Sequence, residues 1–126
     1  IGSKAGRTNQ QTESIAIGLI AGNNMQGTNS IAIGNRSGQT LQGGYSVAIG
    51  HNSGVTTQGQ NSVAIGNQSG FSSQGDDSVA VGNRAGRENL GSSSIAIGDR
   101  ASNSGGSFAS TIVSLTVAVS IISLVF

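Results

Sequence analysis

Large apolar residues alternate with small residues in short blocks that recur every sixteen positions along this chain. Each block reads Ser, Ile or Val, Ala, Ile or Val, Gly, so its side chains follow the period of two that marks a β-strand. An amphipathic helix does not fit, because its period is longer and each internal glycine would destabilise it by about 1 kcal/mol. The sequence therefore predicts one short strand per repeat, and the blocks begin at Ser14, Ser30, Ser46, Ser62, Ser78 and Ser94.

Glycines occupy fixed positions between the predicted strands. Glycine suits a corner of the chain because it adopts positive φ and lets other backbone approach closely. One repeat is therefore expected to form one coil, and successive coils to stack by parallel hydrogen bonding about 4.8 Å apart. The predicted fold class is all-β, a parallel β-roll or β-solenoid with 16-residue coils over residues 1–101. The glycines expected to turn the chain after each strand are Gly18, Gly34, Gly50, Gly66, Gly82 and Gly98.

The alternation gives each predicted strand two faces of different size. We assign the Ile and Val face to the structural core, because bulky β-branched side chains suit a half-buried pleated surface. The core residues expected on this basis are Ile15, Ile17, Ile31, Ile33, Val47, Ile49, Val63, Ile65, Val79, Val81, Ile95 and Ile97.

The alanines of the opposite face are expected to lie near an axis between neighbouring chains. Each coil offers only two large apolar residues, so a single chain would have a thin core. Small residues on the other face would let several chains approach closely, and we favour a homotrimer. The axial residues expected on this basis are Ala16, Ala32, Ala48, Ala64, Ala80 and Ala96.

A glutamine recurs at one position of successive repeats. Identical amides held in register along a stack can form a ladder in which each side chain donates to the next. We expect such a ladder at Gln26, Gln42, Gln58 and Gln74.

The recurring block with its trailing glycines resembles the head repeat of YadA-type trimeric autotransporter adhesins, over residues 1 to about 101. Similar repeats occur in fibre proteins of phages and large viruses. The resemblance implies a left-handed parallel β-roll, three chains per head, and adhesion to host surfaces or matrix. Each repeat here carries an additional segment that ends in Gln-Gly, and no adhesin membrane-anchor domain is expected within residues 102–126.

The composition changes after residue 101. Residues 102–107 are rich in Ser and Gly and are expected to form a linker, and residues 108–126 carry no charge. Three structures stay open for this apolar segment: a strand that pairs with a neighbouring solenoid, a membrane helix, or a coiled-coil stalk. The strand interpretation makes it an assembly or anchor element, with apolar positions at Val113, Leu115, Val117, Val119 and Ile121.

Composition and charge indicate a protein without catalytic machinery. A net charge of +1 gives no basic surface for nucleic acid, and the absence of cysteine excludes disulfides and thiolate metal sites. The only histidine, His51, is expected to be an exposed turn residue, since it lacks converging partners for a metal site or a catalytic triad. The five acidic residues form no cluster that spans repeats. We expect no enzyme activity, no cofactor, and neither catalytic nor metal-binding residues.

The leading functional hypothesis is a structural and adhesive module that binds through many weak contacts along a stiff rod. Its expected partners are further copies of itself and host-surface glycans or matrix proteins, with a membrane contact possible through residues 108–126. Its expected location is extracellular, on a cell surface, an appendage or a virion. The alternative is an extracellular filament subunit, joined head to tail through its apolar C-terminal strand.

Overall fold

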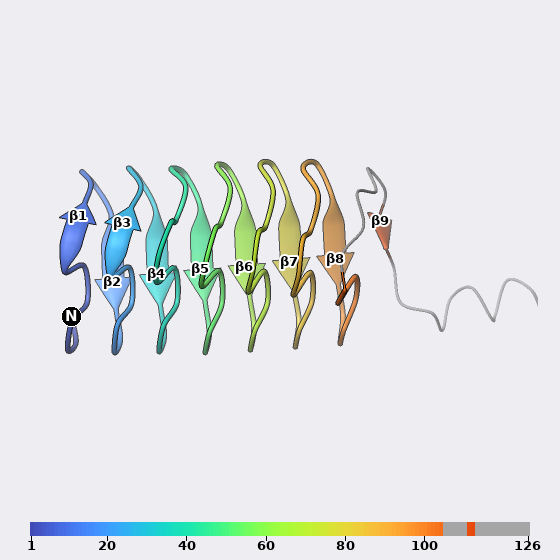
Figure 1. Ribbon diagram of the computed structural model, residues 1–126, viewed down its shortest axis with the longest axis horizontal. Coiled ribbons are helices and arrows are strands. Elements are labelled where there is room, and N and C mark those ends of the chain that lie inside the picture. The colour runs from blue at the N-terminus through green and yellow to red at the C-terminus, as the bar shows by residue number, and fades with distance from the viewer. Residues whose placement is uncertain (105–110, 113–126) are drawn as a thin grey trace, which may run out of the picture.

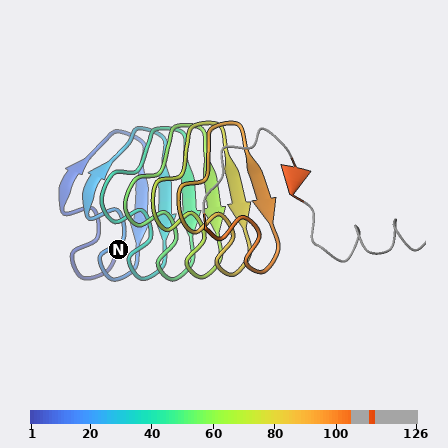
Figure 2. The same cartoon turned by 45° about the vertical axis from the view of Figure 1, so that its right-hand side comes forward.

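The structure is a computed structural model that describes residues 1–104 and 111–112. The chain folds as a parallel β-solenoid whose coils stack side by side along one axis (Figures 1 and 2). One strand from each coil joins a seven-stranded parallel sheet. Its strands are β2 (Ile15–Ile17), β4 (Ile31–Ile33), β5 (Val47–Ile49), β6 (Val63–Ile65), β7 (Val79–Val81), β8 (Ile95–Ile97) and β9 (Thr111–Ile112).

The register of this sheet follows the sixteen-residue repeat without a slip. Ala48, for example, pairs with Ala32 on one side and Ala64 on the other. The predicted all-β solenoid with 16-residue coils is therefore confirmed. Left-handed winding and three chains stay predictions.

A second wall of backbone runs behind the seven-stranded sheet. Its first two coils form strands β1 (Thr8–Gln10) and β3 (Asn24–Gln26), which pair in parallel. The later coils continue this wall through isolated parallel bridges, including those that join Gln26 to Gln42 and Gln42 to Gln58. Each coil is thus a flattened loop with one regular wall and one less regular wall.

The two faces of the sheet are the reverse of those predicted. The strand alanines point into the solenoid and are almost completely buried, so they cannot line an axis between chains. The Ile and Val side chains point outward and are exposed or half-buried within the single chain. The assignments that are wrong for the chain itself are the core residues Ile15, Ile17, Ile31, Ile33, Val47, Ile49, Val63, Ile65, Val79, Val81, Ile95 and Ile97, and the axial residues Ala16, Ala32, Ala48, Ala64, Ala80 and Ala96.

The narrow space between the two walls explains this reversal. Besides the strand alanines, the buried side chains of the described residues are serines, glutamines, two further alanines and Leu90. Small side chains let the walls approach, and a period of two cannot by itself say which face of a strand is inside. From the sequence we assigned the larger residues to the interior, but the two walls lie too close together to hold Ile or Val side chains between them.

The regularly spaced glutamines bridge the interior of each coil and form no amide ladder. The Nε2 atom of Gln42 donates to the carbonyl oxygen of Ile31 at 2.7 Å and more weakly to that of Ser46 at 3.4 Å. The other buried glutamines repeat this bridge to the opposite wall. The glutamines are stacked in register, but each side chain donates to backbone instead of to the next amide. The ladder prediction for Gln26, Gln42, Gln58 and Gln74 is therefore wrong.

A glycine opposite each glutamine makes room for its amide. A Cβ atom built on Gly38 would lie 2.5 Å from Oε1 of Gln42, and the same conflict recurs at the equivalent glycines. The Oε1 atoms of the four buried glutamines have no conventional hydrogen-bond donor. The glycine Cα–H points at this oxygen, and such weak contacts recur where backbone and acceptor come this close. The glycine and the glutamine of one coil therefore act as a pair.

The glycines that follow the strands stack directly on one another. Gly34 has φ of 125°, and a Cβ atom on it would lie 2.5 Å from the carbonyl oxygen of Gly50 in the next coil. Neither the conformation nor the space allows a side chain there. The glycines predicted to turn the chain thus stand where the coil turns and where coils approach most closely.

The parallel sheet extends beyond residue 101, where the solenoid was predicted to end. Strand β9 pairs with β8 in the same sixteen-residue register, with Ile95 opposite Thr111 and Ala96 opposite Ile112. The start of the apolar segment therefore continues the sheet of its own chain. The predicted linker lies partly outside the described residues, and Val113, Leu115, Val117, Val119 and Ile121 lie entirely outside them.

Candidate assembly and binding surfaces

The outer face of the seven-stranded sheet carries two continuous rows of β-branched residues. Each of the strands β2, β4, β5, β6, β7 and β8 places one Ile or Val before its buried alanine and one after it. The exposed members include Ile15 at 46%, Ile65 at 37% and Ile97 at 50%. We call this surface the Ile/Val face. A contiguous apolar surface without an intervening charge is typical of an interface.

The interior of the solenoid buries little apolar area, so the apolar area of the Ile/Val face matters more for stability. Leu90 is the only large aliphatic side chain buried among the described residues, and the remaining apolar core is alanine. Burial of apolar area stabilises a fold by about 25 cal/mol per Å², and alanine contributes little area. The larger apolar side chains of the strands therefore stay exposed or half-buried in a single chain.

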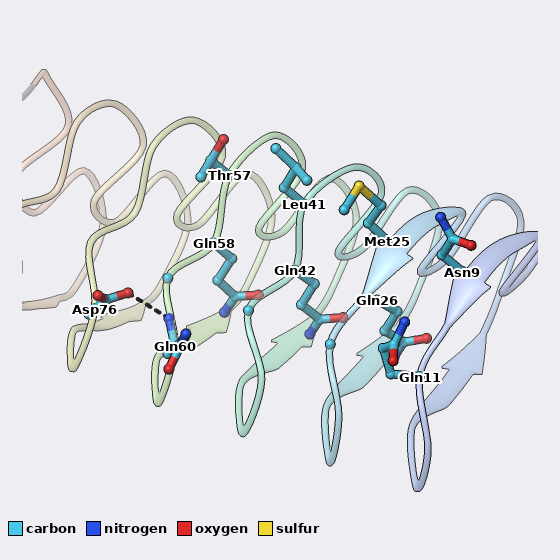
Figure 3. A pocket seen from close by; sticks show the side chains of 13 residues that line it. Asn9, Gln11, Met25, Gln26, Leu41, Gln42, Thr57, Gln58, Gln60 and Asp76 are labelled. Carbon is cyan, nitrogen blue, oxygen red and sulfur yellow. Dashed lines mark hydrogen bonds between the residues drawn. The ribbon is translucent and has the colours of Figure 1, made fainter.

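A shallow groove of about 400 Å³ follows the opposite side of the solenoid. Figure 3 shows Asn9, Met25, Leu41 and Thr57 along one rim, with Gln60 and Asp76 along the other. Glycines at one position of successive coils line it between the rims. Asp76 is the only charged residue of the lining, and its Oδ1 accepts a hydrogen bond from the backbone N–H of Gln60 at 2.8 Å. The groove offers mixed polar and apolar contacts without a catalytic pair.

Side chains do form a ladder, but on the outside of the turns that follow the strands. Asn67 Nδ2 donates to Asn83 Oδ1 at 3.0 Å, and Asn83 Nδ2 donates to Asp99 Oδ1 at 2.7 Å. His51 Nδ1 lies 3.1 Å from Asn67 Oδ1 at the other end. We call these four residues the outer ladder. Of these four residues, only His51 was singled out from the sequence. The recurrence of Asn at the same position of other repeats was the signal that could have predicted the outer ladder.

The structure gives His51 and the acidic residues no chemical site. His51 is exposed, and its partners are the amides of Asn67 and Asn52. Within the described part of the chain, no three His, Cys, Asp or Glu side chains gather in a way that could hold a metal ion. Over those same residues, the chain contains no helix long and apolar enough to cross a membrane.

One surface cluster involves a cation and an aromatic ring. The Arg87 guanidinium lies over the ring of Phe71, 5.6 Å from its centre, and Arg87 also pairs with Glu88. This is the only ion pair among the described residues. The other charged side chains of the described solenoid make no ion pair within the chain.

The comparison with protein-family models gives one match. The model of the YadA head domain repeat matches two copies, at residues 26–37 and 42–69. No curated protein and no solved structure matches the chain significantly. The matched residues contain three of the strand blocks and three of the buried glutamines described above. Residues 26–37 and 42–69 are therefore similar to the YadA head domain repeat, in agreement with the resemblance of the sequence.

Proposed function

We propose that the chain is a non-catalytic adhesive module of an exposed surface, and that it assembles as a homotrimer through the Ile/Val face. The YadA head repeats support an adhesive role at a cell surface or similar location. The observation that carries the assembly is the pair of exposed apolar rows on a chain whose interior holds little apolar area.

The assembly replaces the predicted alanine axis by an isoleucine and valine axis. Burying one Val or Ile side chain fully stabilises a structure by about 1.5–3 kcal/mol relative to leaving it exposed. Each of the strands β2 and β4 to β8 adds two such side chains, so the stabilisation grows with the number of coils. Chains packed on this face would form a rod whose outside presents the grooves and the polar second walls.

The mass of the full chain in solution tests the assembly. Sedimentation equilibrium should give three chains per particle for the unaltered protein and one for Ile49→Asp, because a carboxylate on the Ile/Val face cannot be buried without a partner. Thr56→Asp is the matched control, since Thr56 is exposed on the opposite wall, and it should remain trimeric. A monomeric unaltered protein, or an assembly that Ile49→Asp leaves intact, contradicts the proposal.

Binding to a surface tests the adhesive role separately. The trimer should bind immobilised matrix proteins or glycans, and the monomeric Ile49→Asp variant should bind far more weakly because it loses avidity. Electron micrographs of the same samples distinguish the alternative function. Rods of one solenoid length support the trimeric module, whereas fibres many solenoids long indicate a head-to-tail filament.

A further inference from the structure

Two columns of turn residues border the Ile/Val face along its whole length. One column comes two residues before each strand and includes Glu13 and Asp77. The other comes three residues after each strand and includes Lys4 and Arg84 in the same register. Figure 1 shows the turns in two rows, one beyond each end of the strands. We call the first column the acidic edge and the second the basic edge.

The two edges carry opposite charges that form no ion pair within the described part of the solenoid. Glu13 and Asp77 are the charged members of the acidic edge, and both are exposed. The basic edge holds Lys4, Arg36, Arg84 and Arg100. None of these residues takes part in an ion pair among the described residues. Asp77 accepts only a hydrogen bond from Asn61 Nδ2, at 3.1 Å. The charges are therefore available to a neighbouring molecule.

One acidic and one basic residue of the two edges lie at similar heights along the solenoid axis. Asp77 lies between Gln68 and Arg84 in chain order, so it differs in height from Arg84 by less than one coil, about 4.8 Å. Glu13 lies between Lys4 and Ile20 in the same way. At the axial offset that places Asp77 opposite Arg84, Glu13 is therefore opposite the neutral Ile20, so Asp77 and Arg84 are the charged pair that can set a register.

We propose that these edges fix the direction and the axial register in which copies of the chain associate, with Asp77 of one copy facing Arg84 of the next. The inference rests on the proposed assembly through the Ile/Val face. When the chains pack around an axis parallel to the solenoids, with their Ile/Val faces turned toward it, the end of each strand meets the beginning of a strand in the neighbouring chain. The basic edge of one chain then meets the acidic edge of the next. All rods then point the same way and stand at one height.

The charges disfavour an antiparallel pair on the same face. A twofold axis along the strands reverses one rod but keeps its strand direction, so acidic edge meets acidic edge and basic edge meets basic edge. Like charges across an interface suppress that arrangement, whereas complementary charges at a rim select orientation more than they add affinity. The Ile/Val face alone would accept either packing, so the edges supply the choice.

Engineered cysteines distinguish these packings, because the chain has no cysteine of its own. Asp77→Cys and Arg84→Cys are prepared separately and together, then treated with an oxidant or with a short bis-maleimide, since a direct disulfide requires Cα atoms within about 7 Å. Parallel packing predicts no cross-link in either single variant. It predicts a 77-to-84 link when the two are refolded together and a covalently closed ring in the double variant. Ser73→Cys on the far wall is the control and should not cross-link.

The outcomes separate this inference from the proposed function. If the protein assembles but two Asp77→Cys chains link to each other, or the double variant does not link, the proposed register is wrong and the proposed assembly is not contradicted. A monomeric protein overturns both. Charge exchange gives a second measurement: Asp77→Arg and Arg84→Asp should each weaken assembly, by about five-fold or less per pair. The exchanged double variant should restore it, and a double variant as weak as the singles combined would overturn the pairing.

Discussion

The Nε2 atom of Gln58 donates a hydrogen bond to the carbonyl oxygen of Val47 at 2.8 Å, from one wall of the solenoid to the other. Gln58 is 2% exposed, and its second contact reaches the carbonyl oxygen of Ser62 at 3.4 Å. A single side chain therefore joins the two walls of its own coil to the next coil. Because alanine and serine fill the rest of the interior, this polar bridge takes the place of the large apolar residues of an ordinary core.

Removing the bridge should destabilise the solenoid strongly. Gln58→Ala loses both hydrogen bonds and leaves a cavity, and we expect the free energy of unfolding to fall by about 2–4 kcal/mol. Asn83→Ala is the control, since it also loses two side-chain hydrogen bonds but on the exposed outer ladder. It should lower the free energy by less than about 1 kcal/mol. Urea unfolding followed by circular dichroism, at one protein concentration, measures both, and equal losses would contradict the bridge.

The glycine opposite each glutamine should be as sensitive as the glutamine itself. Gly38 has φ of 52°, and a Cβ atom there would lie 2.5 Å from Gln42 Oε1 and 3.2 Å from the Cβ of Ala32. Gly38→Ala should therefore cost about 2 kcal/mol or more, from the left-handed conformation and the displaced amide. Gly44→Ala in the same coil meets only the Thr28 carbonyl oxygen, at 3.3 Å, and should stay within about 1 kcal/mol of the unaltered protein. A Gly38→Ala protein with an unchanged urea midpoint would show that the amide is free to move aside.

The repeat and its register could be predicted from the sequence, but which face of each strand points into the solenoid could not. The exact spacing of the blocks was enough to predict the parallel sheet, because a strand with a period of two and fixed glycines has few ways to stack. The direction of Ala48 depended on how far apart the walls lie, which is set by residues of the other wall such as Gln42 and Gly38. The hydrogen bond from Gln42 to Ile31 joins residues eleven positions apart and leaves no mark on the strand pattern itself. The outer ladder was not predicted, because Asn83 was not recognised as one member of a column of stacked polar side chains.

The coil between β7 and β8 offers a natural replacement of the glutamine bridge. Leu90 occupies the glutamine position there and packs with Ala80, Ala85 and Ala96. Leu90→Gln should be nearly neutral, within about 1 kcal/mol, because its amide would meet the carbonyl oxygens that correspond to those bound by Gln74. Leu90→Ala should cost about 2–5 kcal/mol through the cavity that it leaves. Urea midpoints of the two variants test this, and a large loss in Leu90→Gln would mean that this coil has lost the space for an amide.

Ile20 is a β-branched residue with a strained, left-handed backbone conformation. Its φ is 62°, and the residues at the same place in other coils, including Asn52 with φ of 57°, are also left-handed. A left-handed conformation costs an ordinary L-residue about 1–2 kcal/mol, and the cost is high for a β-branched side chain but low for asparagine. Ile20→Asn should therefore raise the free energy of unfolding by about 1 kcal/mol, and Asn52→Ile should lower it by a similar amount. Both residues are half-buried, so burial does not favour one exchange over the other. Thermal and urea unfolding of the two variants provide the measurement, and a less stable Ile20→Asn protein would show that Ile20 contributes packing that outweighs its strain.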